Sequence, residues 1–104
     1  MKKTSLFSLG ALLSLSLSLP VLADQVTAMK SGCLGCHKAD AKLVGPSFKD
    51  IAAKYAGQDG IVDQLAATVK SGSAGGKWGD TPMPESPAPL DDIKKVISWM
   101  LTHK

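Results

Sequence analysis

Apolar residues recur along much of the chain at steps of three and four, the period of an amphipathic helix. This pattern predicts helices from Ser47 to Tyr55, from Ile61 to Val69 and from Asp91 to Leu101. A shorter helix is expected over Gln25 to Ser31, ahead of the two cysteines. No segment after residue 23 alternates convincingly between apolar and polar positions, so we predict an all-α fold without strands.

Residues with preferences for helix ends mark the limits of these helices. Ser47 is a suitable N-cap, because its hydroxyl can accept a hydrogen bond from a free backbone N–H of the first turn. Gly57 and Gly72 are expected to end the second and third helices. Asp91 and Asp92 lie in the first turn of the fourth helix, where negative charge is favourable against the helix dipole.

A long loop from Ser71 to Pro89 separates the third and fourth helices. It contains four Gly and four Pro, together with Trp78 and Met83. Loops of this length in compact domains are usually functional or disordered. Because this one keeps a Trp and a Met in so short a chain, we expect it to wrap around a ligand.

The first 23 residues, Met1 to Ala23, have the features of a cleaved secretory signal peptide. Lys2 and Lys3 supply the positive start, and Leu6 to Leu19 is an apolar run diluted by serine. The run is too short for a typical membrane span of about 20 apolar residues. We expect cleavage after Ala23, a periplasmic location and no membrane insertion of the mature protein. An uncleaved N-terminal anchor is the alternative.

Residues 24–104 would then form one domain of 81 residues, a size at which a core alone gives marginal stability. The predicted mature chain has 10 Lys against 9 Asp or Glu, a net charge near +1. That balance, with few aromatic residues, argues against a nucleic-acid-binding protein. The cysteines are too close in sequence to stabilise the chain by closing a loop, whereas a large apolar cofactor would serve.

The chemistry of the domain is indicated by Cys33-Leu34-Gly35-Cys36-His37, the Cys-x-x-Cys-His signature of c-type haem attachment. Two thiols about one helical turn apart can each add across a haem vinyl group to form a thioether. His37 is then placed under the iron as its proximal ligand. A proximal histidine usually donates its second N–H to a carbonyl or carboxylate, and Pro46 in the following turn is the candidate acceptor. We predict one covalently bound haem c with its iron.

Three other uses of the cysteines are conceivable. A thioredoxin-like dithiol requires a βαβ setting, which the pattern does not contain. A zinc site requires four ligands, but only Cys33, Cys36, His37 and His103 are available, and adjacent ligands do not have the usual spacing. A structural disulfide would leave His37, Trp78 and the long loop unexplained.

The second axial position of the iron decides between an electron carrier and a haem enzyme or sensor. Methionine raises the haem potential and blocks the iron to small molecules, whereas an open position allows ligand binding or peroxide chemistry. Met83, stiffened by a proline on each side, is the candidate ligand. Met100 belongs to the apolar stripe of the fourth helix, and Met29 lies too close to the cysteines to reach the opposite face. The alternatives are an open position or ligation by His103, which at a C-terminus is more often solvated.

Four short segments are found together in one order: Gly32 to His37, Val44 to Phe48, Lys77 to Pro84 and Ile97 to Leu101. In these segments the chain resembles the short bacterial class I cytochromes c of the c-551/c-552 type. The resemblance implies a small cytochrome c fold, with four helices wrapped around one covalently bound haem. It also implies His37 and Met83 as axial iron ligands, Pro46 as the partner of His37, and Trp78 directed at a haem propionate.

The same resemblance implies an electron carrier, not an enzyme, that docks briefly with periplasmic or membrane-bound redox proteins. Family members pass electrons from a quinol-oxidising membrane complex to nitrite reductases, terminal oxidases or peroxidases. Lys38, Lys42 and Lys77 would steer acidic partners to the haem edge, or form an ordinary solvated face. We expect a monomer.

Two positions depart from the family pattern. Thr68 stands where related chains commonly carry a basic residue that faces a propionate. Ala28 stands where a bulky apolar residue is common, which implies a thinner contact between the first and last helices. Gly32 is expected to let these two helices approach closely, against Trp99.

Overall fold

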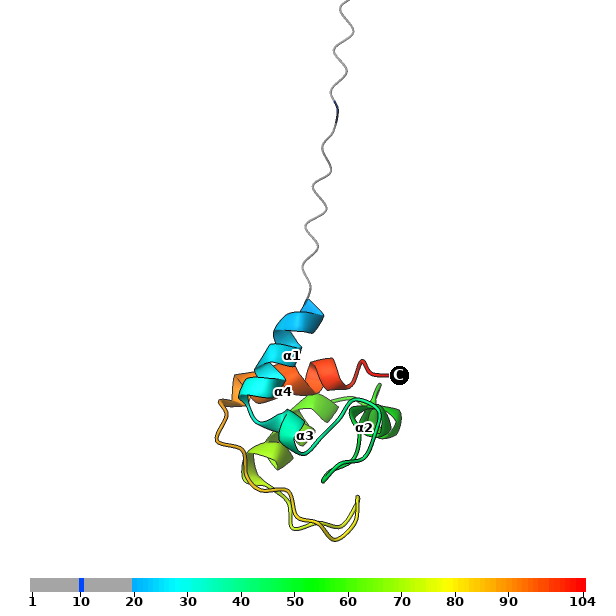
Figure 1. Ribbon diagram of the computed structural model, residues 1–104, viewed down its shortest axis with the longest axis vertical. Coiled ribbons are helices and arrows are strands. Elements are labelled where there is room, and N and C mark those ends of the chain that lie inside the picture. The colour runs from blue at the N-terminus through cyan, green and yellow to red at the C-terminus, as the bar shows by residue number, and fades with distance from the viewer. Residues whose placement is uncertain (1–9, 11–19) are drawn as a thin grey trace, which may run out of the picture.

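The computed structural model describes Gly10 and residues 20–104, and the described chain is built from helices (Figure 1). They are α1 (Pro20–Lys30), the short 3-10 helix η1 (Cys33–Gly35), α2 (Phe48–Tyr55), α3 (Ile61–Ser71) and α4 (Leu90–Met100). Within the described residues, strand-like pairing is confined to isolated bridges in the loop between α3 and α4. The predicted all-α fold is confirmed.

The helix ends follow the residues that predicted them. The N–H of Asp50 donates to Ser47 Oγ at 3.0 Å, so Ser47 is the N-cap of α2. α3 ends before Gly72, whose φ of 77° is a conformation that favours glycine. α4 carries Asp91 and Asp92 in its first turn, as predicted.

α1 begins earlier than the sequence predicts, at Pro20 instead of Gln25. Proline suits the first position of a helix, because the N–H that it lacks would have no helical partner there. α1 therefore includes the predicted cleavage position after Ala23. Apart from Gly10 and the start of α1, the predicted signal peptide lies outside the described residues, so its cleavage stays a prediction.

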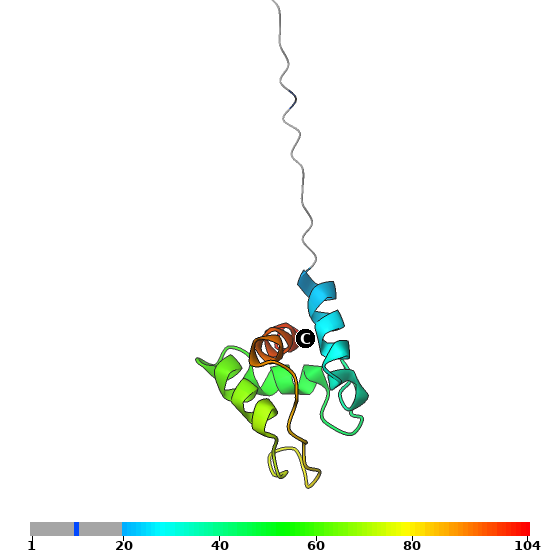
Figure 2. The ribbon, with the colours of Figure 1, turned by 90° about the vertical axis from the view of Figure 1, so that its left-hand side faces the viewer.

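The core forms where α1 and α3 pack against α4 (Figure 1 and Figure 2). From α1 it contains Ala28, which is fully buried, so the small side chain closes the contact with α4 without a gap to solvent. Met100 is a core residue, as predicted. The stripe that α4 buries consists of Ile93, Val96, Ile97, Trp99 and Met100.

Gly32, between α1 and η1, has a different role from the expected one. A Cβ at this position would meet no heavy atom within 4 Å, so the expectation of a close helix approach through Gly32 is wrong. Its φ of 77° is a left-handed conformation that side chains with a Cβ rarely adopt. The glycine therefore permits the turn that leads from α1 into the cysteine motif.

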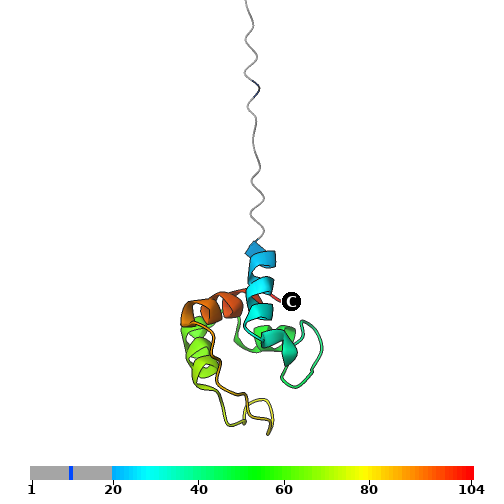
Figure 3. The same ribbon diagram turned by 60° about the vertical axis from the view of Figure 1, so that its left-hand side comes forward.

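The loop from Ser71 to Pro89 is more ordered than a structureless connection. Ser73 and Met83 form an antiparallel bridge, in which the N–H of each donates to the carbonyl of the other at 2.8 and 2.9 Å. Gly72 allows this close pairing, since a Cβ there would lie 2.8 Å from the Met83 carbonyl oxygen. Figure 3 shows this loop and the segment 36–46 extending from different sides of the helical body.

Ala28→Leu should destabilise the protein, because the added atoms have no space in the contact between α1 and α4. Overpacking of this kind costs about 1–3 kcal/mol in the free energy of unfolding. Denaturant titration followed by circular dichroism measures the loss. Ala67→Leu, on the exposed face of α3, is the matched control and should stay within about 0.5 kcal/mol of the parent. Equal effects of the two substitutions would contradict the tight packing at Ala28.

Candidate haem site

The cysteine motif forms one tight turn with two free thiols. Cys33 begins η1, Cys36 follows its end, and the N–H of His37 donates to the Cys33 carbonyl at 3.0 Å. Cys33 is partly buried against the core, and this burial raises the pKa of its thiol more than a backbone hydrogen bond lowers it. Cys36 is exposed. The alternative of a disulfide between the two cysteines is not realised.

His37 bonds to the protein through one ring nitrogen. Its Nδ1 lies 2.7 Å from the carbonyl oxygen of Pro46, the acceptor named from the sequence. A carbonyl can only accept, so Nδ1 carries the proton and Nε2 keeps its lone pair. An imidazole anchored through its N–H in this way is the form in which histidine usually binds a metal.

Backbone hydrogen bonds fold the segment after His37 back onto the imidazole. The N–H of Gly45 donates to the Cys36 carbonyl at 2.8 Å, and the N–H of Phe48 donates to the Lys38 carbonyl at 2.8 Å. Gly45 then lies directly against the ring, because a Cβ there would be 2.5 Å from His37 Cε1. Any side chain at position 45 would displace the ring or the segment.

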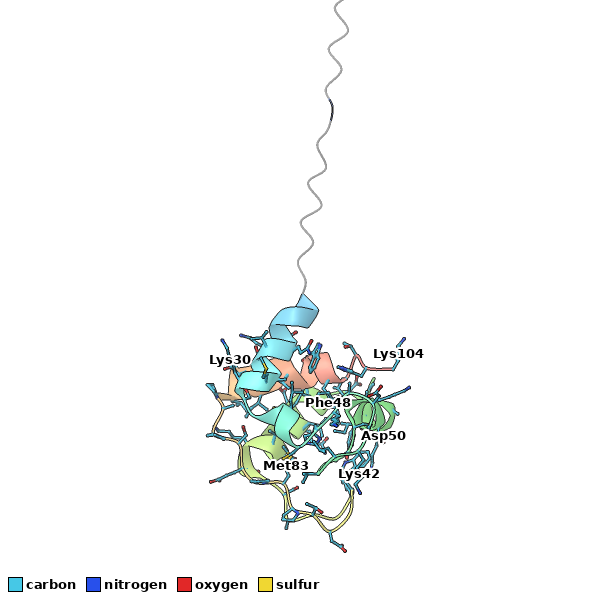
Figure 4. All side chains as sticks on the ribbon, in the orientation of Figure 1. Lys30, Lys42, Phe48, Asp50, Met83 and Lys104 are labelled. Atoms are coloured by element: carbon cyan, nitrogen blue, oxygen red, sulfur yellow. The ribbon has the colours of Figure 1, made fainter. Side chains whose placement is uncertain are left out.

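An aromatic cluster supports the imidazole from the core. Phe48, the first residue of α2, stacks on His37 with ring centroids 5.8 Å apart and 20° between the planes. Trp99 meets Phe48 edge-on at 5.4 Å, and Figure 4 shows Phe48 close to both α2 and α4. The imidazole therefore rests on a side chain that is itself 2% exposed and packed in the core.

His103 belongs to the same cluster, so the expectation that it is a solvated residue is wrong. Its ring centroid lies 4.6 Å from that of Trp99 and 5.5 Å from that of Phe48. Its Nδ1 is 2.9 Å from the Met100 carbonyl, and the residue is partly buried. These contacts hold His103 beside the aromatic support of His37, which argues against it as the ligand opposite His37.

Met83 approaches from the loop between α3 and α4 (Figure 4). Both of its backbone groups are bonded to Ser73, and a proline stands on each side of it, so the backbone at this position is well restrained. Its side chain is partly buried. Of the other two methionines after residue 23, Met29 is 60% exposed on α1 and Met100 is buried in the core.

Trp78 lies five residues before Met83 and is 40% exposed. Its ring meets Tyr55 of α2 edge-on, with centroids 6.4 Å apart. Trp78 therefore packs against α2 through this contact. Its direction toward a haem propionate stays a prediction.

Two residues next to His37 have roles that sequence reasoning missed. Gly45 is named only within the segment from Val44 to Phe48, and Phe48 only as part of an apolar helix face. A glycine directly before the acceptor Pro46 is a signal for close approach that could have pointed to Gly45. The stacking of Phe48 had no such signal, since it depends on the chain reversal between Lys38 and Phe48.

Residues 24–104 match the family model described as Cytochrome c. The chain belongs to the cytochrome c family. Cytochrome c-551 of Azotobacter vinelandii is 55% identical to it over 73 residues, which cover 70% of this chain and 88% of the relative. Cytochrome c-551 of Allochromatium vinosum is 48% identical over 81 residues, which cover 77% of this chain and 85% of the relative.

The fold of this cytochrome agrees with that of a solved relative. The crystal structure of wild-type Nitrosomonas europaea cytochrome c552 matches it with a TM-score of 0.73 and 43% sequence identity. The match covers 77% of this chain and 99% of that one. This protein is therefore a monohaem electron-transfer protein and not an enzyme, and the cysteine motif binds one haem c covalently, with its iron.

The residues of the structure fit such a group. Leu43, Val44 and Trp78 are 43%, 52% and 40% exposed, and they lie on the two segments that carry His37 and Met83. A porphyrin is large and apolar enough to cover such surface, whose exposure is otherwise unfavourable. Two free thiols beside a histidine with a free Nε2 also supply the donors that haem attachment needs.

A zinc site and a membrane-spanning helix have no support in the part of the chain that the structure describes. No group of three His, Cys, Asp or Glu side chains there could hold a metal ion, which argues against the zinc alternative. No described helix combines the length and the apolar character that a membrane span needs.

Gly45→Ala should disturb the packing around His37, because its Cβ would lie 2.5 Å from His37 Cε1. Overpacking should lower the free energy of unfolding by about 1–3 kcal/mol. Displacement of the ring should also weaken the hydrogen bond to Pro46 and shift the His37 resonances in the NMR spectrum. The control is Gly35→Ala in the cysteine motif, where a Cβ would meet no heavy atom within 4 Å. If Gly35→Ala has the larger spectral effect, the packing of Gly45 on His37 is not what orients the ring.

Proposed function

We propose that this cytochrome shuttles single electrons in the periplasm, with its iron held axially by His37 Nε2 and the Met83 thioether. The observation that carries the proposal is the His37–Pro46 hydrogen bond of 2.7 Å, which leaves Nε2 as the free nitrogen. Met83 supports it as the partly buried methionine of a restrained loop. The bound haem supplies the one-electron chemistry of its iron.

The protein residues set the conditions for that chemistry. Pro46 orients the imidazole and makes it a stronger donor by accepting its N–H. The thioether of Met83 would favour the reduced state of the bound iron and would keep small molecules from binding to it. Gly45 and Phe48 both pack against the ring, which restrains its position.

Met83→Ala tests the ligand directly. The oxidised parent should show the weak absorption band at the red end of the visible spectrum that is typical of a Met–Fe(III) bond. The variant should lose this band, have a lower reduction potential and bind added imidazole at least about tenfold more tightly. Met29→Ala, on the exposed face of α1, is the matched control and should leave all three properties unchanged. A high-spin spectrum of the parent would instead favour a sensor or enzyme with an open sixth position.

Periplasmic location is the second part of the proposal, and it is supported by the signal-like segment Met1 to Ala23. The partners proposed are redox proteins of that compartment: a quinol-oxidising complex as donor, and a nitrite reductase, terminal oxidase or peroxidase as acceptor. Lys38, Lys42 and Lys77 are exposed and would steer acidic partners toward the haem edge during brief docking. The carrier would act as a monomer.

Intact mass spectrometry of the protein from a periplasmic extract tests this location. The expected mass is that of residues 24–104 plus one haem, because cleavage after Ala23 removes the signal peptide. A control with Ala23→Arg should accumulate uncleaved, since a signal peptidase requires a small residue there. Recovery of the full chain of 104 residues from the membrane fraction would instead support an N-terminal anchor.

A further inference from the structure

The residues that follow α4 are hydrogen-bonded to its end. The N–H of Thr102 donates to the Trp99 carbonyl at 3.0 Å, and the Thr102 hydroxyl donates to the same carbonyl at 2.6 Å. His103 repeats this arrangement one residue later, because its N–H and its Nδ1–H both donate to the Met100 carbonyl, at 3.1 and 2.9 Å. A carbonyl oxygen has two lone pairs and accepts both bonds. Backbone and side chain together therefore fix the position of the His103 ring.

The ring fixed in this way packs on the aromatic cluster. Its centroid lies 4.6 Å from that of Trp99, with 88° between the planes, and 5.5 Å from that of Phe48, with 57° between the planes. Edge-on and tilted pairs of this kind stabilise a structure beyond the area that they bury. Phe48 and Trp99 are core residues, whereas His103 is only partly buried, so its ring covers the cluster from outside the core.

Phe48 links the His103 ring to the imidazole of His37. It stacks on His37 with ring centroids 5.8 Å apart, and it contacts Trp99 and His103 as well. Removal of the His103 ring would leave space beside Phe48, and a side chain next to such a space relaxes into it only in part. Any such movement of Phe48 changes the contact that it makes with His37.

A histidine suits this position because it combines two properties. Its Nδ1–H satisfies a carbonyl at the end of α4, where the last carbonyls of a helix lack partners within the helix. Its ring packs on Trp99 and Phe48. Phenylalanine would supply the ring without the donor, and asparagine would supply a donor without the ring. The two properties can therefore be removed one at a time.

We propose that His103 is a positioning residue for His37. Its imidazole, held by the Met100 carbonyl, keeps Phe48 in the place from which Phe48 restrains the His37 ring. His103 thus acts through Phe48, without contact with the iron. The inference rests on the proposed ligation of the iron by His37 and adds a residue after α4 to the support of that ligand.

The test is His103→Ala in the haem-loaded protein, studied by NMR. In the reduced form, the Nδ1 proton of His37 should exchange with solvent about threefold to tenfold faster than in the parent, the ratio that loss of one aromatic pair gives. In the oxidised form, the paramagnetic shifts of the His37 ring protons depend on the orientation of the ring and should differ from those of the parent. Unchanged exchange and unchanged shifts would overturn the proposal.

Two further variants at the same position separate the ring from the hydrogen bond. His103→Phe keeps a ring against Phe48 and Trp99 and should restore both His37 signals toward those of the parent. His103→Asn keeps a donor for the Met100 carbonyl and should resemble His103→Ala. The reverse result, with rescue by asparagine and none by phenylalanine, would make His103 a helix cap and not a positioning residue.

The matched control is Thr102→Val, which removes the side-chain hydrogen bond to the Trp99 carbonyl at the same end of α4 but removes no ring. It should lower the free energy of unfolding while leaving the His37 signals as in the parent. If it accelerates the exchange of the His37 proton as much as His103→Ala does, the effect is one of general stability and the proposal fails. Absence of paramagnetic shifts on His37 in the oxidised parent would instead refute His37 as an iron ligand, and the exchange of its Nδ1 proton would still test His103.

Discussion

The hydrogen bond from His37 Nδ1 to the Pro46 carbonyl is the contact on which the rest of the site depends. It decides which nitrogen is free, and therefore which atom of the imidazole can reach the iron. The bond requires the chain to reverse within nine residues, and main-chain hydrogen bonds hold that reversal. It also requires a residue without a side chain at position 45, because the backbone passes directly over the ring.

Phe48 connects this site to the core. It touches His37 on one side and Trp99 of α4 on the other, and it begins α2 immediately after the Ser47 cap. A change in the packing of α4 would therefore reach His37 through one ring. Interiors packed at crystal-like density move little, so the contact with Phe48 restrains the imidazole. For an electron carrier that restraint is useful, since small movements of the ligand between oxidation states favour fast exchange.

Sequence reasoning predicted the elements whose cause is local. Apolar periodicity placed α2, α3 and α4 close to their observed limits, and the Ser47 cap follows from the chemistry of its own side chain. Pro46 could be named because it lies near His37 in sequence. The contacts of Gly45 and Phe48 with His37, and the burial of His103, arise only after the chain reverses. No period or spacing records such contacts, and the role expected of Gly32 was wrong for the same reason.

α2 is a short helix, and its length sets the distance between the side chains at its two ends. Its eight residues bury one face, and the two ends of that face carry Phe48 beside His37 and Tyr55 beside Trp78. Phe48 at one end packs against His37, while near the other end the Lys54 ammonium lies 4.6 Å from the Trp78 ring centroid. If Lys54 stood one turn earlier on α2, its positive charge would lie closer to His37, where it would disfavour the oxidised state of an iron bound there. The distance along α2 thus keeps the positive charge of Lys54 apart from His37 within one small domain.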